Sequence, residues 1–260
     1  MKDVCSVHET CLVVTCEHGG NDIPADFTSL FDGFRETLDS HRGYDPGALG
    51  LARHFADILD VPLFAATISR LLIDCNRSLR NRTLFSPVTR SLSEPEREAF
   101  IKRFYLPFRQ PVEKCIEGHI REGCRVLHLS VHTFTPVLDG VLRRGDIGLL
   151  YDPARTGERE LCLDWQLRLR MLLPDLVIRR NYPYRGTSDG FVSMFRKRYG
   201  PEHYLGCELE VNQKHSTGAP AASTCCDDAS ALRERQPDEA DEWRRIRDAL
   251  IESFKNVYSS

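Results

Sequence analysis

The sequence predicts a single α/β domain in which a mixed, mostly parallel central sheet is flanked by helices. Three observations predict it. Short apolar runs alternate with helical patterns along most of the 260 residues, polar clusters directly follow several of these runs, and no second domain boundary is visible. Strands that alternate with helices are typical of α/β sheets. Because such sheets bind ligands beyond the carboxyl ends of their strands, the polar clusters are the candidate sites.

The composition excludes several classes of protein. Hydrophobic residues make up 41%, charged residues 28%, and the formal net charge is −3, all ordinary values for a globular protein. A near-balanced charge argues against nucleic acid as a partner. No apolar run approaches the roughly 20 residues that span a bilayer, so no membrane is expected. Residues 1–10 lack the pattern of a signal peptide. The ten cysteines include no C-x-x-C pair. We therefore expect reduced thiols and a cytoplasmic location.

The first half of the chain begins with a buried strand, predicted by the apolar run at residues 11–16. Apolar residues at helical spacing predict a helix over residues 46–60. A second strand is expected over residues 62–68, extended to about residue 73. Ser93 and Glu96 have the spacing of a capping box, which opens a helical stretch over residues 95–122. We expect Pro107 and Pro111 to break this helix.

The second half contains further apolar runs, which predict strands over residues 125–134, 147–151, 176–181 and 204–211, with a helix over residues 158–172. Residues 214–236, which include Cys225 and Cys226, predict a mobile surface loop. A helix over residues 237–257 follows. Its apolar stripe favours packing on the domain over binding a partner protein, and comprises Trp243, Ile246, Leu250, Phe254 and Val257.

Two histidines lie at the ends of predicted strands. His18 comes directly after the first strand, beside two glycines that let the backbone turn sharply. His132 ends the strand at residues 125–134, on the same face as His128 and Ser130. A neutral imidazole at such a place can bind a metal ion. A turn histidine that is hydrogen-bonded to the backbone is the alternative.

Three more clusters carry charge. Asp45 precedes Pro46 at the start of a helix, where it is either an N-cap or a carboxylate metal ligand. Arg70, Asn76 and Arg77 follow the second strand, and guanidinium groups there favour a site for a small anion. Arg185 lies in a loop rich in Tyr, Arg and Gly, of the kind that often closes over ligands.

The last predicted strand carries Glu208 and Glu210, which alternate with apolar residues and so point to one face. Buried carboxylates are costly unless they are paired, bound to metal or used as a base. Together the clusters supply two histidines, an aspartate, an arginine-rich anion site and a glutamate. These groups are typical of a hydrolytic metal site. No G-x-S-x-G, P-loop or G-x-G-x-x-G motif is present.

The order of these clusters resembles the N-formylglutamate amidohydrolase family, which is related to the zinc carboxypeptidases and aspartoacylase. The resemblance covers residues 13–213 and rests on the ordered motifs EHGGNDIP, GYDPGALG, SRLLIDCNRS, HLSVHTFTP, NYPYRGTSDG and LGCELEVNQ. It implies a mixed α/β fold and one zinc ion per chain. It also implies cleavage of N-formyl-L-glutamate, or a similar small anionic N-acyl amino acid, as in histidine degradation.

The resemblance also implies a zinc ligand set. His18 and His132 match the two zinc histidines of the family. Where the carboxypeptidase relatives have a glutamate ligand three positions after the first histidine, this chain has Asn21. Asp45 is therefore the expected carboxylate ligand, and Asn21 is expected to contact the substrate or to support the ligands.

The remaining roles follow from the same motifs. Arg70 would polarise the scissile carbonyl, and Glu210 would be the general base, with Glu208 as the competitor. Asn76 and Arg77 would bind the carboxylate of the substrate, and Arg185 a second one. The alternatives are another N-acyl-amino-acid deacylase, a carboxypeptidase-like peptidase or a non-catalytic protein that binds small carboxylates. The sequence indicates no oligomeric state.

Overall fold

The computed structural model describes residues 9–216 and 237–258, with the side chains of residues 237–240 left aside. A six-stranded sheet forms its centre, with the strand order β2-β1-β3-β8-β6-β7. Only the pairing of β6 with β8 is antiparallel within this sheet. The strands are β1 (Thr10–Cys16), β2 (Leu63–Ala65), β3 (Arg125–Phe134), β6 (Ile147–Leu150), β7 (Ile178–Arg180) and β8 (Tyr204–Asn212). The predicted fold class is confirmed.

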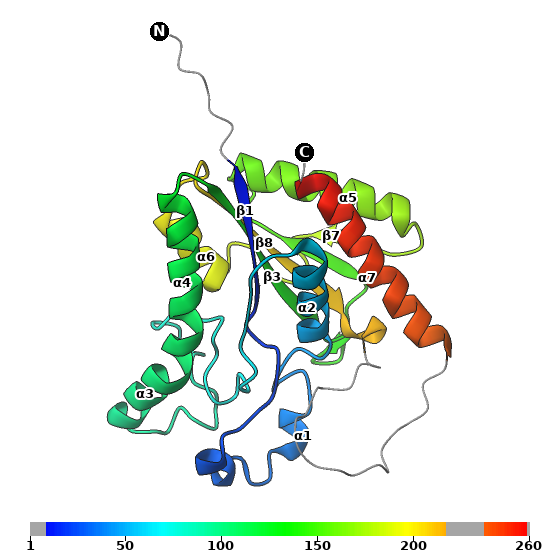
Figure 1. The fold of residues 1–260 in the computed structure, drawn as a ribbon. Coiled ribbons are helices and arrows are strands. Elements are labelled where there is room, and N and C mark those ends of the chain that lie inside the picture. Colours follow the sequence, from blue (N-terminus) through cyan, green and yellow to red (C-terminus); the bar gives the residue numbers. More distant parts are fainter. Residues whose placement is uncertain (1–8, 217–236, 259–260) are drawn as a thin grey trace.

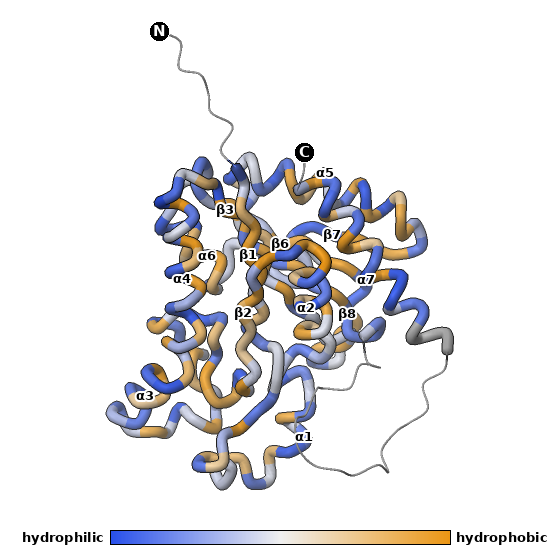
Figure 2. The backbone as a smooth tube through the Cα atoms, viewed as in Figure 1, coloured by the Kyte–Doolittle hydropathy of each residue, from blue (hydrophilic) through white to orange (hydrophobic). Residues whose placement is uncertain are grey.

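Helices cover both faces of this sheet (Figure 1). The helices α2 (Ala48–Leu59), α5 (Thr156–Leu172) and α7 (Pro237–Tyr258) pack on one face, and α4 (Leu106–Arg121) and α6 (Phe191–Arg198) pack on the other. Figure 2 shows that hydrophobic residues are concentrated in the central strands. The smaller elements are a 3-10 helix (Ala25–Phe31), α1 (Arg35–Leu38), α3 (Glu94–Phe100), a hairpin of β4 (Val137–Leu138) and β5 (Val141–Leu142), and a 3-10 turn (Gln213–His215).

Strand alternation divides the sheet residues between the two faces. Odd-numbered residues of β3 and β8, such as Leu129 and Leu209, join the large apolar core under α2, α5 and α7. Even-numbered residues point toward α4 and α6. There the apolar core is smaller and includes Val126 and Tyr204, and the same face carries buried polar residues nearer the carboxyl ends of the strands.

The second strand is shorter than predicted, because β2 ends at Ala65. Beyond β2 the chain has no regular strand but still runs alongside the segment that comes after β1. Gly19 and Asp22 donate backbone hydrogen bonds to the carbonyls of Ala66 and Thr67. A side chain at Gly20 would clash with the Thr67 carbonyl, 2.4 Å from a Cβ atom placed there. The apolar residues 71–73 leave the sheet and pack in a separate cluster with α3 and its surroundings.

The prolines do not break the long helical stretch where the sequence predicts a break. Pro107 lies in the first turn of α4 and Pro111 lies inside it. The interruption is a π-helical turn over Ile101–Tyr105, between α3 and α4. Pro107, which has no amide hydrogen, is tolerated in the first turn of a helix. The capping box of Ser93 and Glu96 is confirmed, since the Glu96 carboxylate accepts a hydrogen bond from the Ser93 amide at 2.7 Å.

In the terminal helix, Ile246, Leu250 and Phe254 are fully buried and join the core under α2, α5 and α7. The mobile loop is predicted over residues 214–236, and of these residues 217–236, with Cys225 and Cys226, lie outside the described residues. Its first residues belong to the 3-10 turn at Gln213–His215. The seven cysteines that the structure describes are free. Among the described helices, none is both long and apolar enough to cross a bilayer.

Candidate metal site and substrate cavity

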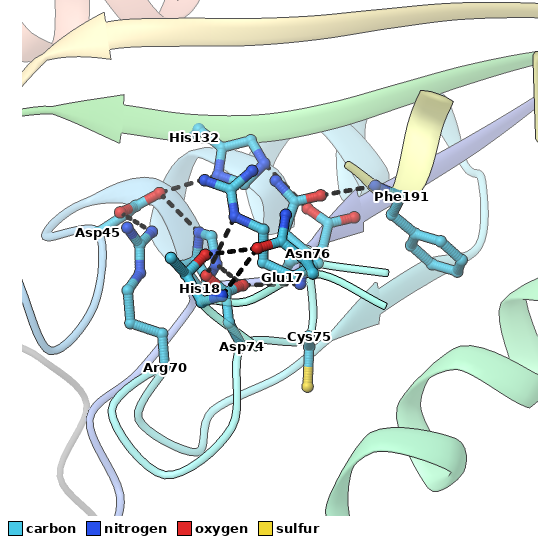
Figure 3. A network of polar contacts seen from close by, with 12 residues as sticks. Glu17, His18, Asp45, Arg70, Asp74, Cys75, Asn76, His132 and Phe191 are labelled. Carbon is cyan, nitrogen blue, oxygen red and sulfur yellow. Dashed lines mark hydrogen bonds and ion pairs between the residues drawn. The ribbon is translucent and has the colours of Figure 1, made fainter. Parts of the chain in front are cut away.

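Three side chains meet at the carboxyl edge of β1 and β3. His18 lies just beyond β1, Asp45 precedes α2, and His132 lies near the end of β3. One ligand atom from each lies within 4.8 Å of the others. Asp45 Oδ2 is 2.8 Å from His132 Nδ1 and 3.5 Å from His18 Nδ1. All three side chains are buried and face one another (Figure 3), so this group could hold a metal ion.

The hydrogen bonds of His18 fit such an ion. Its Nε2 lies 2.7 Å from Asp74 Oδ1, whereas its Nδ1 is buried without a hydrogen-bond partner. A proton on Nε2 satisfies Asp74 and leaves the Nδ1 lone pair directed at Asp45 and His132. Metal-binding histidines commonly donate their second N–H to a carboxylate in this way. Asp74 therefore supports His18, which sequence reasoning did not predict.

His132 is held in a matching way. Its Nδ1 faces Asp45, and its Nε2 lies 3.0 Å from Glu17 Oε2 and 2.9 Å from Ser130 Oγ. Burial opposes a charge on this ring, but hydrogen bonds to Asp45 and Glu17 outweigh it and raise the pKa of His132 well above its usual value. Glu17 was also missed by sequence reasoning. The sequence pattern could have indicated Glu17, because this residue continues the alternation of Val13 and Thr15 on the polar face.

Asp45 is not the N-cap of α2. That position belongs to Gly47, and Asp45 only offers its carbonyl to the Ala48 amide. Its carboxylate instead accepts a hydrogen bond from the Arg70 guanidinium, at 2.5 Å from Oδ1. Burial disfavours this charge, but Arg70, His18 and His132 outweigh the burial and hold the pKa of Asp45 well below its usual range.

The two glutamates of β8 sit beside the β3 residues that approach the metal group. Glu210 is in register with His132, and Glu208 with Ser130. Burial raises the pKa of Glu210 to about 8 against the opposing effect of His132. Its Oε2 atom is buried without a hydrogen-bond partner. Burial also raises the pKa of Glu208. Glu210 is thus an uncompensated carboxyl group next to a candidate metal ligand.

A cavity of about 200 Å³ opens above this group, and its lining combines both histidines, Asp45 and both glutamates with cationic residues. The predicted substrate residues Asn76, Arg77 and Arg185 all line it, as does Arg70. The side-chain carbonyl oxygen of Asn76 accepts a hydrogen bond from the Phe191 backbone amide at 2.7 Å. This bond fixes the orientation of the Asn76 side-chain amide. The lining also includes His41, Phe134, Tyr184, Ser188 and Asp189, which the sequence analysis did not assign to the site.

Arg77 is held from two sides. Its Nη1 donates to the Asp189 carbonyl at 2.5 Å, and its Nε lies 3.7 Å from Asp74 Oδ2. Asn21 is the one predicted site residue that the structure does not bring to the cavity lining. Its amide donates to the Leu38 carbonyl at 3.2 Å and to Asp39 at 2.9 Å, so it fastens α1 instead.

Fold and site thus define a mixed α/β protein with a buried His–Asp–His group, a carboxylate beside it and a cationic cavity at the carboxyl edge of the sheet. The sequence matches the model of the N-formylglutamate amidohydrolase family over residues 10–216. The chain belongs to this family of hydrolases, and the resemblance drawn from its motifs is confirmed.

Two solved structures share the fold. A gene product of Agrobacterium tumefaciens is 25% identical with a TM-score of 0.70, covering 96% of this chain and 92% of that one. An N-formylglutamate amidohydrolase from Ralstonia eutropha is 20% identical with a TM-score of 0.67, covering 97% of this chain and 95% of that one. No curated protein matches the sequence.

Proposed function

We propose that the chain is a zinc-dependent amidohydrolase that cleaves N-formyl-L-glutamate, or a similar N-acyl amino acid, into a carboxylic acid and the amino acid. The observation that carries this proposal is the buried Nδ1 of His18. It lacks a hydrogen-bond partner and faces Asp45 and His132. A buried polar atom without a partner is costly, and a metal ion at this point would satisfy it.

His18, Asp45 and His132 would hold the ion as two imidazoles and one carboxylate, a donor set that suits zinc and leaves a position open for water. Bound zinc supplies a water molecule whose pKa falls towards ~7 and a positive charge that polarises a carbonyl. Asp74 and Glu17 keep the two rings in the tautomer that offers Nδ1 to the ion.

Glu210 is proposed as the general base. It sits next to His132 across the β3–β8 pairing, and a pKa raised by burial suits a group that first takes a proton and later returns it. It would accept the proton of the attacking water and give it to the leaving amine. Arg70, which lines the cavity while bonded to Asp45, would stabilise the negative charge that develops on the carbonyl oxygen.

Asn76 and Arg77 would bind the α-carboxylate of the substrate. Both line the cavity and both are fixed by bonds to residues 189–191. A preorganised guanidinium binds a carboxylate more tightly because it loses less conformational freedom. Arg185 lies on the cavity wall as well. It would bind a second carboxylate, so that the site prefers N-acyl derivatives of acidic amino acids.

The test combines elemental analysis of the purified protein with measurement of formate release from N-formyl-L-glutamate, with and without a chelator. We expect about one zinc ion per chain and release that the chelator abolishes. Zinc without release from this or other N-acyl amino acids would leave a non-catalytic binding protein. The absence of both, after zinc has been added back, would refute the proposal.

Histidine variants locate the ion. His18→Ala and His132→Ala are each expected to lose the bound metal, because each removes one of three ligands. The matched control is His54→Ala, which removes a histidine from α2 that bonds Asp248 at 3.4 Å, away from the cavity. This control is expected to keep a full complement of zinc. A full complement in His18→Ala or His132→Ala would exclude that histidine as a ligand.

A further inference from the structure

A line of buried polar side chains leads away from the candidate metal site under α4 and α6. It runs through His132, Glu17, Thr15, His128 and Tyr204, none of which is more than 3% exposed. These residues come from β1, β3 and β8 and the residue after β1. The proposed reaction makes no use of Thr15, His128 or Tyr204, although burying such groups is costly unless each is hydrogen-bonded.

The hydrogen bonds of this line have a fixed direction. The Thr15 hydroxyl donates its single proton to Glu17 Oε1, at 2.6 Å. Thr15 Oγ1 must therefore accept from His128 Nε2, which lies 2.7 Å away. A neutral His128 with its proton on Nε2 leaves Nδ1 as an acceptor, and the Tyr204 hydroxyl lies 2.7 Å from it. Burial lowers the pKa of His128 to about 4, which keeps the ring neutral at neutral pH.

Glu17 links this line to His132 and accepts hydrogen bonds on both of its carboxylate oxygens. Thr15 donates to Oε1, Ser130 donates to Oε2 at 2.7 Å, and His132 Nε2 lies 3.0 Å from Oε2. Both Glu17 oxygens therefore act as acceptors, and the Nε2 of His132 that faces them carries a proton. The other nitrogen of His132, Nδ1, faces Asp45 Oδ2 at 2.8 Å and would turn its lone pair to a bound metal ion.

We propose that Tyr204, His128 and Thr15 are positioning residues, which act through Glu17 to fix His132 as an Nδ1 metal ligand. This inference rests on the proposed metal site and adds a second layer to it. Loss of the Tyr204 hydroxyl leaves the buried Nδ1 of His128 without a donor, so that only the bond from Nε2 to Thr15 still orients the ring. A less firmly held His128 weakens the geometry in which Thr15 donates to Glu17.

The surroundings favour this role over a merely space-filling one. Phe191 and Phe195 pack with their rings steeply inclined to that of His128, at centroid distances of 5.9 and 5.7 Å. Such walls exclude water, so no solvent molecule is expected to replace a missing partner in the line. Removing a supporting hydrogen bond behind a metal ligand commonly weakens metal binding by about 10–100-fold.

The test measures zinc affinity by competition with a chromophoric chelator in the full chain. Thr15→Val removes the hydroxyl at nearly constant volume, and Thr15→Ser restores it. We expect the dissociation constant for zinc to rise about tenfold or more in Thr15→Val and to stay within about threefold of wild type in Thr15→Ser. Glu17→Gln is expected to show the largest rise. Tyr204→Phe should shift the constant in the same direction by a smaller factor.

Tyr258→Phe is the control for the loss of a tyrosine hydroxyl that is hydrogen-bonded and partly buried. Its hydroxyl donates to the Thr10 carbonyl at 2.7 Å, at the opposite end of β1. This variant is expected to leave the zinc constant unchanged, whatever it does to the free energy of unfolding. Equal zinc constants in wild type and Thr15→Val would overturn the proposal while leaving the metal site intact. A wild-type chain that binds no zinc would instead remove the proposed function as well.

Nitrogen-15 chemical shifts of the histidine rings give a readout that needs no metal. In the metal-free wild type, His128 is expected to be neutral with its proton on Nε2. In Tyr204→Phe, the Nε2–H tautomer should persist, because Thr15 still needs a donor, while the Nδ1 shift should change as its hydrogen bond is lost. A wild-type His128 that carries its proton on Nδ1, or on both nitrogens, contradicts the direction of the line.

Discussion

The two faces of the central sheet are built from the same strands but serve different ends. On the face under α2, α5 and α7, the central positions of β3 and β8 present apolar residues, such as Leu129, Val131 and Leu209. On the opposite face, the alternate positions of the same strands present polar groups, such as Ser130, His132 and Glu210. A shift of one residue along either strand would exchange the two sets.

This difference shows where stability and chemistry are placed in the molecule. The apolar face gains free energy mainly from burial, which requires no specific partner for a hydrocarbon group. Each buried polar group on the other face requires a partner, and the partners come from distant segments: Asp74 for His18 and Glu17 for His132. Where partners are lacking, as at Glu210 Oε2 and His18 Nδ1, the structure has groups that are available for binding and catalysis.

The largest expected effect comes from the polar face. Glu210→Gln should lower kcat for N-formyl-L-glutamate by about 10²–10⁴-fold, because it removes the proposed base. The zinc content should not change. Glu208→Gln is the matched control, since it lies two residues earlier on the same strand and lines the same cavity. It should lower kcat by about tenfold at most, and a greater loss in this variant would transfer the role of base to Glu208.

The second prediction concerns the apolar face. Phe254 on α7 is fully buried against Phe55 and Trp165, at ring-centroid distances of 5.7 and 4.8 Å. Phe254→Ala should lower the free energy of unfolding by about 3–5 kcal/mol in urea titrations, through lost burial and a cavity. Zinc affinity in the folded state should stay at the wild-type value. A parallel loss of zinc affinity would show that the two faces are energetically coupled.

A smaller effect is expected from the stability of the metal-free protein. Burial raises the pKa of Glu210 from 4.5 to about 8. The contribution of the neutral Glu210 carboxyl group to the free energy of unfolding is therefore present below pH 4.5 and is lost as the pH rises through 8. Glu210→Gln has no ionisable group at this position, so the variant does not lose stability in this way. In chelator-treated protein, the variant should match wild type near pH 5 and exceed it by on the order of 2 kcal/mol at pH 8.

Thermal unfolding at several pH values measures this difference. Glu252→Gln, a change on the outer side of α7, serves as the control and should leave the pH dependence unaltered. If wild type and Glu210→Gln keep the same difference in stability from pH 5 to pH 8, the Glu210 carboxyl is not held in its neutral form. The pair of measurements on this variant then separates its catalytic effect from its effect on the fold.

The fold was largely predictable because hydrophobic alternation and capping are local in sequence. The bounds predicted for β3 agree with the structure, and those for β1 and β8 differ by one residue at one end. The prediction failed for β2, which was expected to continue beyond Ala65. Apolar residues there pack in the separate cluster around α3, and a single apolar run does not reveal which core will bury it.

The candidate site was predictable only in part, since its ligands are local features and their supports are not. His18 and Asp45 flank regular elements and His132 lies near the end of β3, and the family resemblance brought them together. Asp74 lies 56 residues from its partner His18. A pairing of this kind depends on the order of strands in the sheet, which the residues alone did not give.

Asn21 gives the smallest expected effect and the sharpest contrast with the sequence-based expectation. It was expected to contact the substrate or to support the ligands, but its amide bonds Leu38 and Asp39 and its side chain does not line the cavity. Asn21→Ala should therefore change kcat/KM by less than about twofold. Loss of its two hydrogen bonds, one partly buried and one exposed, should lower the free energy of unfolding by about 0.5–1.5 kcal/mol. Asn76→Ala, which alters a residue of the cavity wall, should raise KM far more. A large loss of kcat/KM in Asn21→Ala with unchanged stability would place this residue in contact with the substrate after all. The substrate site would then include the segment after β1 as well as the polar face of the sheet.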